Sequence, residues 1–176
     1  STSSIEKFDS DGVRVTTNYP FTVSTTIQKV RTISGDRFAV TYTGGNDSVS
    51  IRNNDGTAST TVASGLACGT NCDPTDILEL PDGRFLISYQ IAAVQGIELY
   101  SSTFVRIGTF FQNSTLLQNI SSMALLANGN VLACSSTFNV CEQLAISGSV
   151  GVRVGSSAFI DDASRVRQPT DVVVVP

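Results

Sequence analysis

Short runs in which hydrophobic and polar side chains alternate fill most of this chain. A period of two residues predicts half-buried β-strands, and no stretch shows convincingly the 3.6-residue period of an amphipathic helix. Between the runs lie turn-forming residues, among them Asp-Gly and Asn-Gly pairs, which accept the positive φ of a tight hairpin. These turns are Ser34-Gly35-Asp36, Asn54-Asp55-Gly56, Pro81-Asp82-Gly83 and Asn128-Gly129-Asn130. The pattern predicts an all-β chain in which helices are almost absent.

The alternating runs recur with a period of about 47 residues. Three similar strands contain Phe38, Phe85 and Val131, which are 47 and 46 residues apart. A four-stranded unit of this length is typical of a β-propeller blade, which buries both faces of its sheet by stacking on the next blade. A second motif, hydrophobic-Arg-hydrophobic, repeats with the same period. Its arginines are Arg14, Arg106 and Arg153, which are 92 and 47 residues apart, or two periods and one.

We therefore predict one all-β domain over residues 1–176, a four-bladed β-propeller-like arrangement that is one strand short of closure. Its repeat units are approximately 1–22 together with 168–176, 23–67, 68–116 and 117–167. Three explanations of the missing strand stay open. The two ends could close a four-bladed ring with one thin blade, which we favour. The chain, which begins at Ser1, could be cut from a longer array, or a neighbouring copy could donate the strand and form a head-to-tail polymer.

The absence of histidine narrows the chemistry that this chain can perform. It removes nucleophile triads that use His, His-ligated zinc sites and the usual general base near neutral pH. Carboxylates are left, as in glycoside hydrolases, but no pair stands out: Asp161 and Asp162 are adjacent and would point to opposite faces of a strand. We expect no enzymatic activity, no metal and no cofactor.

The chain is weakly acidic, with 15 acidic and 11 basic residues and a net charge of −4. This charge disfavours nucleic acid and anionic membrane surfaces as partners. The longest apolar runs, at 123–127 and 172–175, are far too short to cross a bilayer, so we expect no membrane insertion.

Four cysteines form two pairs that are close in the sequence, Cys68 with Cys72 and Cys134 with Cys141. Neither pair has the Cys-x-x-Cys spacing of a metal site. We expect two local disulfides in an oxidising compartment, the second across the turn between two strands. Cross-pairing of the four cysteines and free thiols are the alternatives. Loops this short lose little chain entropy on cross-linking, so the disulfides would serve mainly to hold a loop in place.

Three sequons for N-glycosylation begin at Asn46, Asn113 and Asn119. A chain with this many Ser and Thr residues contains about as many by chance. Asn46 and Asn113 fall in expected turns or strand ends, from which a glycan could project. With the disulfides, the sequons favour an extracellular or cell-surface glycoprotein.

Two segments resemble the tandem repeats of about fifty residues found in large secreted and surface-anchored bacterial proteins, including RTX-type adhesins. Residues 8–12 read Phe-Asp-Ser-Asp-Gly, and residues 80–89 read Leu-Pro-Asp-Gly-Arg-Phe-Leu-Ile-Ser-Tyr, with Tyr89 where that family often has Trp. The resemblance implies an extracellular structural module and transfers no catalytic residue. The lack of Trp and the presence of Cys134 in a strand depart from the repeat.

The side chains that could contact a ligand are Arg14, Arg106, Arg153 and Tyr89. The arginines would lie at equivalent points of outermost strands, where Arg also prevents edge-to-edge pairing; we favour this second role. The predicted function is an extracellular structural or adhesive module that contacts copies of itself, as in a filament or surface layer, or other surface proteins. The alternative is a glycan-binding, lectin-like propeller whose pocket includes Tyr89.

Overall fold

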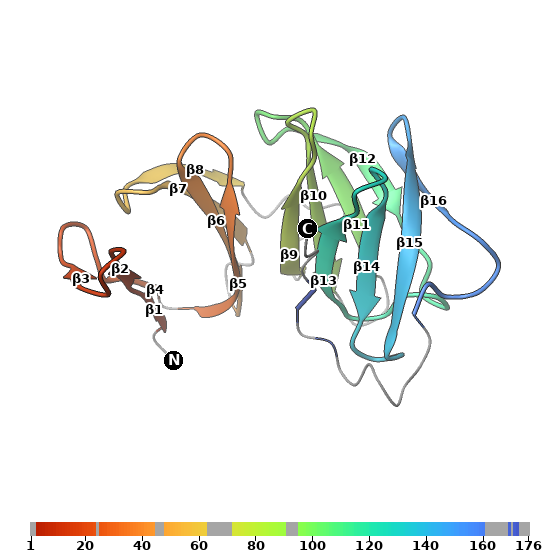
Figure 1. Ribbon diagram of the computed structural model, residues 1–176, viewed down its shortest axis with the longest axis horizontal. Helices are drawn as coiled ribbons and strands as arrows, with labels where there is room; N and C mark the ends of the chain where they lie inside the picture. Colours follow the sequence, from red (N-terminus) through yellow and green to blue (C-terminus); the bar gives the residue numbers. More distant parts are fainter. Residues whose placement is uncertain are drawn as a thin grey trace.

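The computed structural model describes residues 3–23, 25–44, 48–62, 72–90, 95–160, 169 and 171–172. Every regular element in these ranges is a β-strand, so the predicted all-β class is confirmed there (Figure 1). The strands are β1 (Ser3–Ile5), β2 (Lys7–Phe8), β3 (Arg14–Val15), β4 (Phe21–Val23), β5 (Thr26–Ile33), β6 (Arg37–Thr43), β7 (Ser48–Asn53), β8 (Ala58–Val62), β9 (Asp73–Glu79), β10 (Phe85–Gln90), β11 (Gln95–Tyr100), β12 (Arg106–Phe111), β13 (Ile120–Leu125), β14 (Val131–Ser135), β15 (Val140–Ser147) and β16 (Val150–Arg153).

Twelve of these strands form three four-stranded antiparallel sheets, β5–β8, β9–β12 and β13–β16. Within each sheet the strands follow in chain order, and the first strand lies innermost, against the first strand of the next sheet. The N-terminal strands form one irregular hairpin from two short pairs, β1 with β4 and β2 with β3. It therefore contributes only the outer half of a unit.

Alternation along the strands explains why the sheets stack. On β10, Phe85 and Ile87 point into a core shared with β5–β8, whereas Leu86 points into the core shared with β13–β16. All three side chains are fully buried. The central sheet thus loses apolar surface to water on both faces, which an isolated sheet cannot do.

The turns form where the Asp-Gly and Asn-Gly pairs predict them. Before β10, Gly83 has φ +81°, its N–H bonds to the Leu80 carbonyl at 2.9 Å, and the Leu80 N–H bonds to the Arg84 carbonyl at 2.8 Å. Such positive φ is readily accessible to Gly and costly for most other residues. The turn before β14 repeats both bonds with Gly129. The local chemistry of these pairs therefore sets where each strand reverses.

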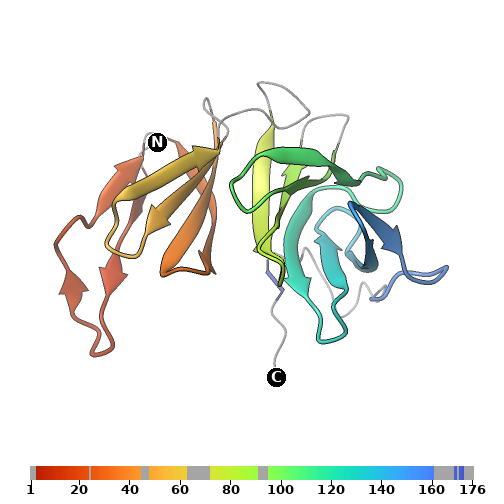
Figure 2. The same cartoon turned by 90° about the horizontal axis from the view of Figure 1, so that it is seen from above.

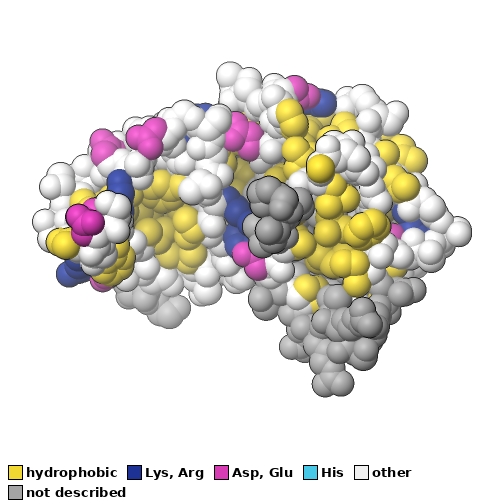
Figure 3. Space-filling view, viewed as in Figure 1, with side chains coloured by type: hydrophobic (Ala, Val, Ile, Leu, Met, Phe, Trp, Pro, Cys, Tyr) yellow, Lys and Arg dark blue, Asp and Glu magenta, His cyan; other side chains and the backbone are white. Residues whose placement is uncertain are grey.

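In the part of the chain that the structure describes, the sheets do not close into a ring. The N-terminal hairpin lies at one end of the row of sheets and β13–β16 at the other (Figures 1 and 2). Hydrophobic side chains gather over this last sheet in Figure 3. Of residues 168–176, which we expect to add a strand to the first repeat unit, Pro169, Asp171 and Val172 are described, and none of them is in a strand.

One predicted disulfide is present, between Cys134 on β14 and Cys141 on β15. The two residues are direct partners across the ladder, which brings their side chains together on one face. Cys72 is also disulfide-bonded. Cys68, its expected partner, lies outside the described residues.

Candidate functional site

Three polar side chains occupy equivalent places on the innermost strands of the three sheets: Lys29 on β5, Asp76 on β9 and Ser122 on β13. Their partners across the ladders are the equivalent second-strand residues Thr41, Ser88 and Cys134. Because β9 packs against both β5 and β13, the three side chains come to one place where the sheets meet.

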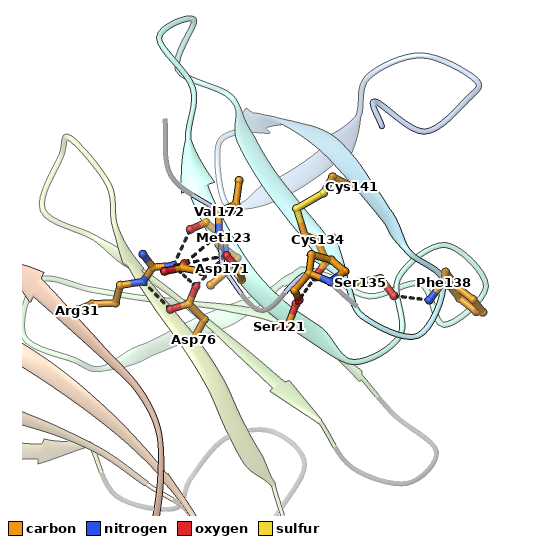
Figure 4. Close-up of a disulfide and its surroundings, with 12 residues drawn as sticks. Arg31, Asp76, Ser121, Met123, Cys134, Ser135, Phe138, Cys141, Asp171 and Val172 are labelled. Atoms are coloured by element: carbon orange, nitrogen blue, oxygen red, sulfur yellow. Dashed lines mark hydrogen bonds and ion pairs between the residues drawn. A yellow bond between two sulfur atoms is a disulfide. The ribbon is translucent and has the colours of Figure 1, made fainter. Parts of the chain in front are cut away.

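Asp76 is fully buried, and groups from all three sheets satisfy its carboxylate (Figure 4). The Arg31 guanidinium on β5 donates from Nε to Oδ1 at 2.9 Å and from Nη2 to Oδ2 at 2.8 Å. The Met123 N–H on β13 donates to Oδ2 at 2.7 Å, and the N–H of Ile77 donates to Oδ1 at 2.9 Å. The hydrogen bonds with Asp76 are the main cause of a raised pKa of Arg31, so the guanidinium stays charged.

A second carboxylate, Asp171, reaches the same guanidinium from the C-terminal segment. Its Oδ1 accepts from Arg31 Nη2 at 2.9 Å and from Ser122 Oγ at 3.3 Å, and it lies 3.2 Å from Lys29 Nζ. The Val172 N–H also donates to it, at 2.9 Å. Partial burial opposes ionisation, but the charge of Arg31 and the contact with Lys29 outweigh it and lower the pKa of Asp171.

A cleft of about 620 Å³ lies beside this network at the starts of the inner strands. Each described residue that lines it carries a hydroxyl, an amide or an amine: Gln28, Lys29, Thr75, Asn119, Ser121, Ser136, Thr137 and Asn139. Lys29 belongs to both the cleft and the ion-pair network. The disulfide between Cys134 and Cys141 closes the hairpin whose turn supplies three of the lining residues, so it holds that turn in place.

The predicted arginines do not meet at a ligand site, because each of them pairs with a glutamate close to it in the sequence. Arg106 forms two hydrogen bonds with Glu98, at 2.8 and 2.9 Å, and Arg153 forms two with Glu142, at 2.7 and 2.9 Å. Glu98 and Glu142 are buried, at 0% and 2% side-chain exposure. The sequence analysis did not anticipate these glutamates, although Glu6 and Glu98 both stand eight residues before their arginines.

The N-terminal hairpin carries the same pair without the burial. Arg14 Nη2 lies 3.0 Å from Glu6 Oε1, but the Glu6 side chain is 41% exposed. Phe8, which faces Arg14 across the ladder, is 55% exposed. The residues facing Arg106 and Arg153 in the same way, Tyr100 and Leu144, are buried. The hairpin therefore exposes positions that the complete sheets bury.

The remaining predicted site residues are dispersed. Tyr89 is buried in the core between the first two sheets, so its ring does not line the cleft. Asn119 lies in the cleft, and Asn113 accepts from the N–H and hydroxyl of Thr115 in a local turn. Asn46 lies outside the described residues. Glycosylation at the three sequons stays a prediction.

Neither a metal site nor a membrane span is found in the part of the chain that the structure describes. No three His, Cys, Asp or Glu side chains there are grouped to hold an ion. No helix there is long and apolar enough to cross a membrane.

The sequence analysis did not identify Lys29, Arg31 or Asp76 as site residues. One signal pointed to them: the Pro-Thr-Asp motif that ends at Asp76 recurs at Asp171. Both aspartates bind the same arginine, so the repeated motif marks repeated positions around one centre.

No family model matches this chain, and neither does any curated protein. Solved structures do resemble it. A protein proposed to be a gluconolactonase aligns with a TM-score of 0.68 at 12% identity, over 85% of this chain and 55% of that one. A proposed 6-phosphogluconolactonase of Bacteroides fragilis aligns with a TM-score of 0.63 at 15% identity, over 94% of this chain and 49% of that one. The WD40 β-propeller domain of Doa1 aligns with a TM-score of 0.55 at 14% identity, over 77% of this chain and 40% of that one.

The fold is propeller-like. At such low identity the likeness extends to the fold alone. The chain spans about half the length of the solved structures it matches.

Glu98 and Glu6 occupy equivalent positions but differ in burial, so we expect their substitutions to differ in their effect on stability. Replacing Glu98 with Gln leaves the Arg106 guanidinium without its buried counter-charge, and we expect a loss of about 2–3 kcal/mol of unfolding free energy. The same change at Glu6, an exposed pair, should cost less than about 0.5 kcal/mol. Urea denaturation followed by circular dichroism measures both. Equal losses would show that burial of the pair has no effect.

Proposed function

We propose that this chain is a non-enzymatic, extracellular adhesive module that binds glycans in the cleft at the starts of its inner strands. The lining of the cleft carries this proposal. Hydroxyl and amide groups both donate and accept hydrogen bonds, which suits the hydroxyls of a sugar ring. An apolar ligand could form no hydrogen bonds with these groups.

The chemistry of the lining residues indicates how a glycan would be bound. No aromatic ring lies among these residues, so recognition depends on hydrogen bonds without stacking. Each such bond contributes only about 1 kcal/mol net, so we expect a dissociation constant of about a millimolar for a single site. Adhesion would then depend on several copies acting together, as repeated display on a surface allows.

We propose no catalytic role for the cleft. Glycoside hydrolysis uses two carboxylates facing the scissile bond, and no carboxylate is among the described lining residues. Asp76 is buried, with both oxygens engaged. The lactonase names belong to proteins that share only the fold with this chain. The disulfide between Cys134 and Cys141 is compatible with the extracellular location that we propose.

Blocking the cleft tests the proposal. Thr137 lies in an exposed turn at the edge of the cleft, and its replacement by Trp fills the opening without disturbing the core. On an array of neutral and acidic oligosaccharides, we expect Thr137→Trp to weaken binding at least about tenfold. Ser102→Trp, in an exposed turn elsewhere, is the control and should bind as the unmodified chain does. Binding to no glycan, or equal binding by both variants, would contradict the proposal.

A second candidate function is self-assembly into a filament or surface layer. The exposed Phe8 and Glu6 favour it, because their equivalents in the other sheets are buried. The N-terminal hairpin lacks the two inner strands of a unit, and a second copy could supply one. The finer architecture that we propose, a ring of four blades of about 47 residues, would be complete only when both missing strands are supplied.

Sedimentation velocity over a range of concentrations tests self-assembly. We expect the sedimentation coefficient to rise with concentration and Phe8→Ser to abolish the rise, because this change removes the apolar contact. Phe159→Ser, at an equally exposed phenylalanine, is the matched control and should associate normally. A chain that stays monomeric throughout would rule the candidate out.

A further inference from the structure

We propose that Lys29, Arg31 and Ser122 form a carboxylate-binding subsite of the cleft and that Asp171 of the same chain occupies it. The ligand would then be an acidic glycan, one that contains a uronic acid, and it would compete with the C-terminal segment. This inference depends on the proposed glycan binding and specifies its ligand class.

The geometry resembles that of a ligand held by a site. Donors from two different sheets converge on Oδ1 of Asp171: Arg31 and Lys29 from β5 and Ser122 from β13. The N–H of Val172, on the same segment as Asp171, supplies the remaining contact. A carboxylate on a separate molecule could keep the three contacts from the sheets and lose only that one.

The two aspartates that share Arg31 differ in how easily they could be displaced. Asp76 is completely buried and accepts four hydrogen bonds, so its removal would leave the Arg31 guanidinium with only its exposed partner, Asp171. Asp171 has a side chain that is 60% exposed. Exposed ion pairs contribute about 0–1 kcal/mol, which a competing carboxylate could replace.

The subsite would persist after Asp171 leaves. Two hydrogen bonds to Asp76 hold the Arg31 guanidinium in its present orientation. A donor that is already oriented loses less conformational entropy when it binds an anion. Asp76 thus acts as a positioning residue for the subsite.

The subsite is continuous with the cleft. Lys29 lines the cleft and contacts Asp171, and the Ser121 hydroxyl in the cleft donates to the carbonyl of Pro169, two residues before Asp171. The volume of about 620 Å³ is within the range of small-ligand sites. A uronic acid could place its ring hydroxyls against the amides and its carboxylate at Lys29.

Trigalacturonic acid and its methyl ester test the inference, because the ester keeps the sugar rings and their hydroxyls and removes the negative charge. We expect titration calorimetry to show that the acid binds at least about tenfold more tightly than the ester. Asp171→Ala should strengthen binding of the acid by about fivefold, since it removes the competitor. Lys29→Gln should abolish the preference for the acid. Arg37→Gln, at a cation outside the cleft, should preserve it.

Three outcomes distinguish failure of this inference from failure of the proposed function. Equal binding of acid and ester, both blocked by Thr137→Trp, would overturn the carboxylate subsite and leave glycan binding in place. Acid binding that Asp171→Ala leaves unchanged would overturn the competition with the C-terminal segment. Failure of both ligands, together with no binding on the oligosaccharide array, would overturn the proposed function itself.

Discussion

A single buried carboxylate, that of Asp76, constrains how the three sheets pack. Its charge is fully removed from water, so it must be met by groups of the protein, and these come from β5, from β9 and from the backbone of β13. Apolar packing is non-directional, so it would let one sheet slide past the next. The four hydrogen bonds to the Asp76 carboxylate are directional and would break if the sheets slid. The ion pair therefore sets the register of the innermost strands, and with it the place of the polar cleft.

The outer strands carry a second polar constraint that repeats with the unit. Glu98 with Arg106 and Glu142 with Arg153 join the third and fourth strands of their sheets, and each glutamate is buried. The equivalent pair in the N-terminal hairpin has the same residue types but lies open to solvent. The same pair of residue types is thus buried in two complete sheets and exposed in the N-terminal hairpin. This difference in exposure identifies the end of the row of sheets at which a unit is incomplete.

The fold could be predicted from local sequence because its signals are local. Hydrophobic and polar residues alternate along each strand with a period of two. Gly83 specifies the turn between β9 and β10, and Gly129 specifies the turn between β13 and β14. The disulfide between Cys134 and Cys141 also follows from a hairpin. The central network could not be predicted in this way, because Arg31 and Asp76 are 45 residues apart and meet only through the stacking of sheets. Tyr89 shows the converse limit: its place in the repeat suggested a ligand contact, but alternation turns its side chain into the core.

Thermal and urea unfolding of Asp76→Asn, compared with Asp171→Asn, tests the central role of the buried carboxylate most directly. The first substitution leaves Arg31 with only its exposed partner and weakens a link between three sheets, so we expect it to cost about 3 kcal/mol of unfolding free energy. The second removes an exposed pair and should cost less than about 1 kcal/mol. Equal and small losses in the two variants would contradict the account, because apolar packing alone would then hold the sheets in register.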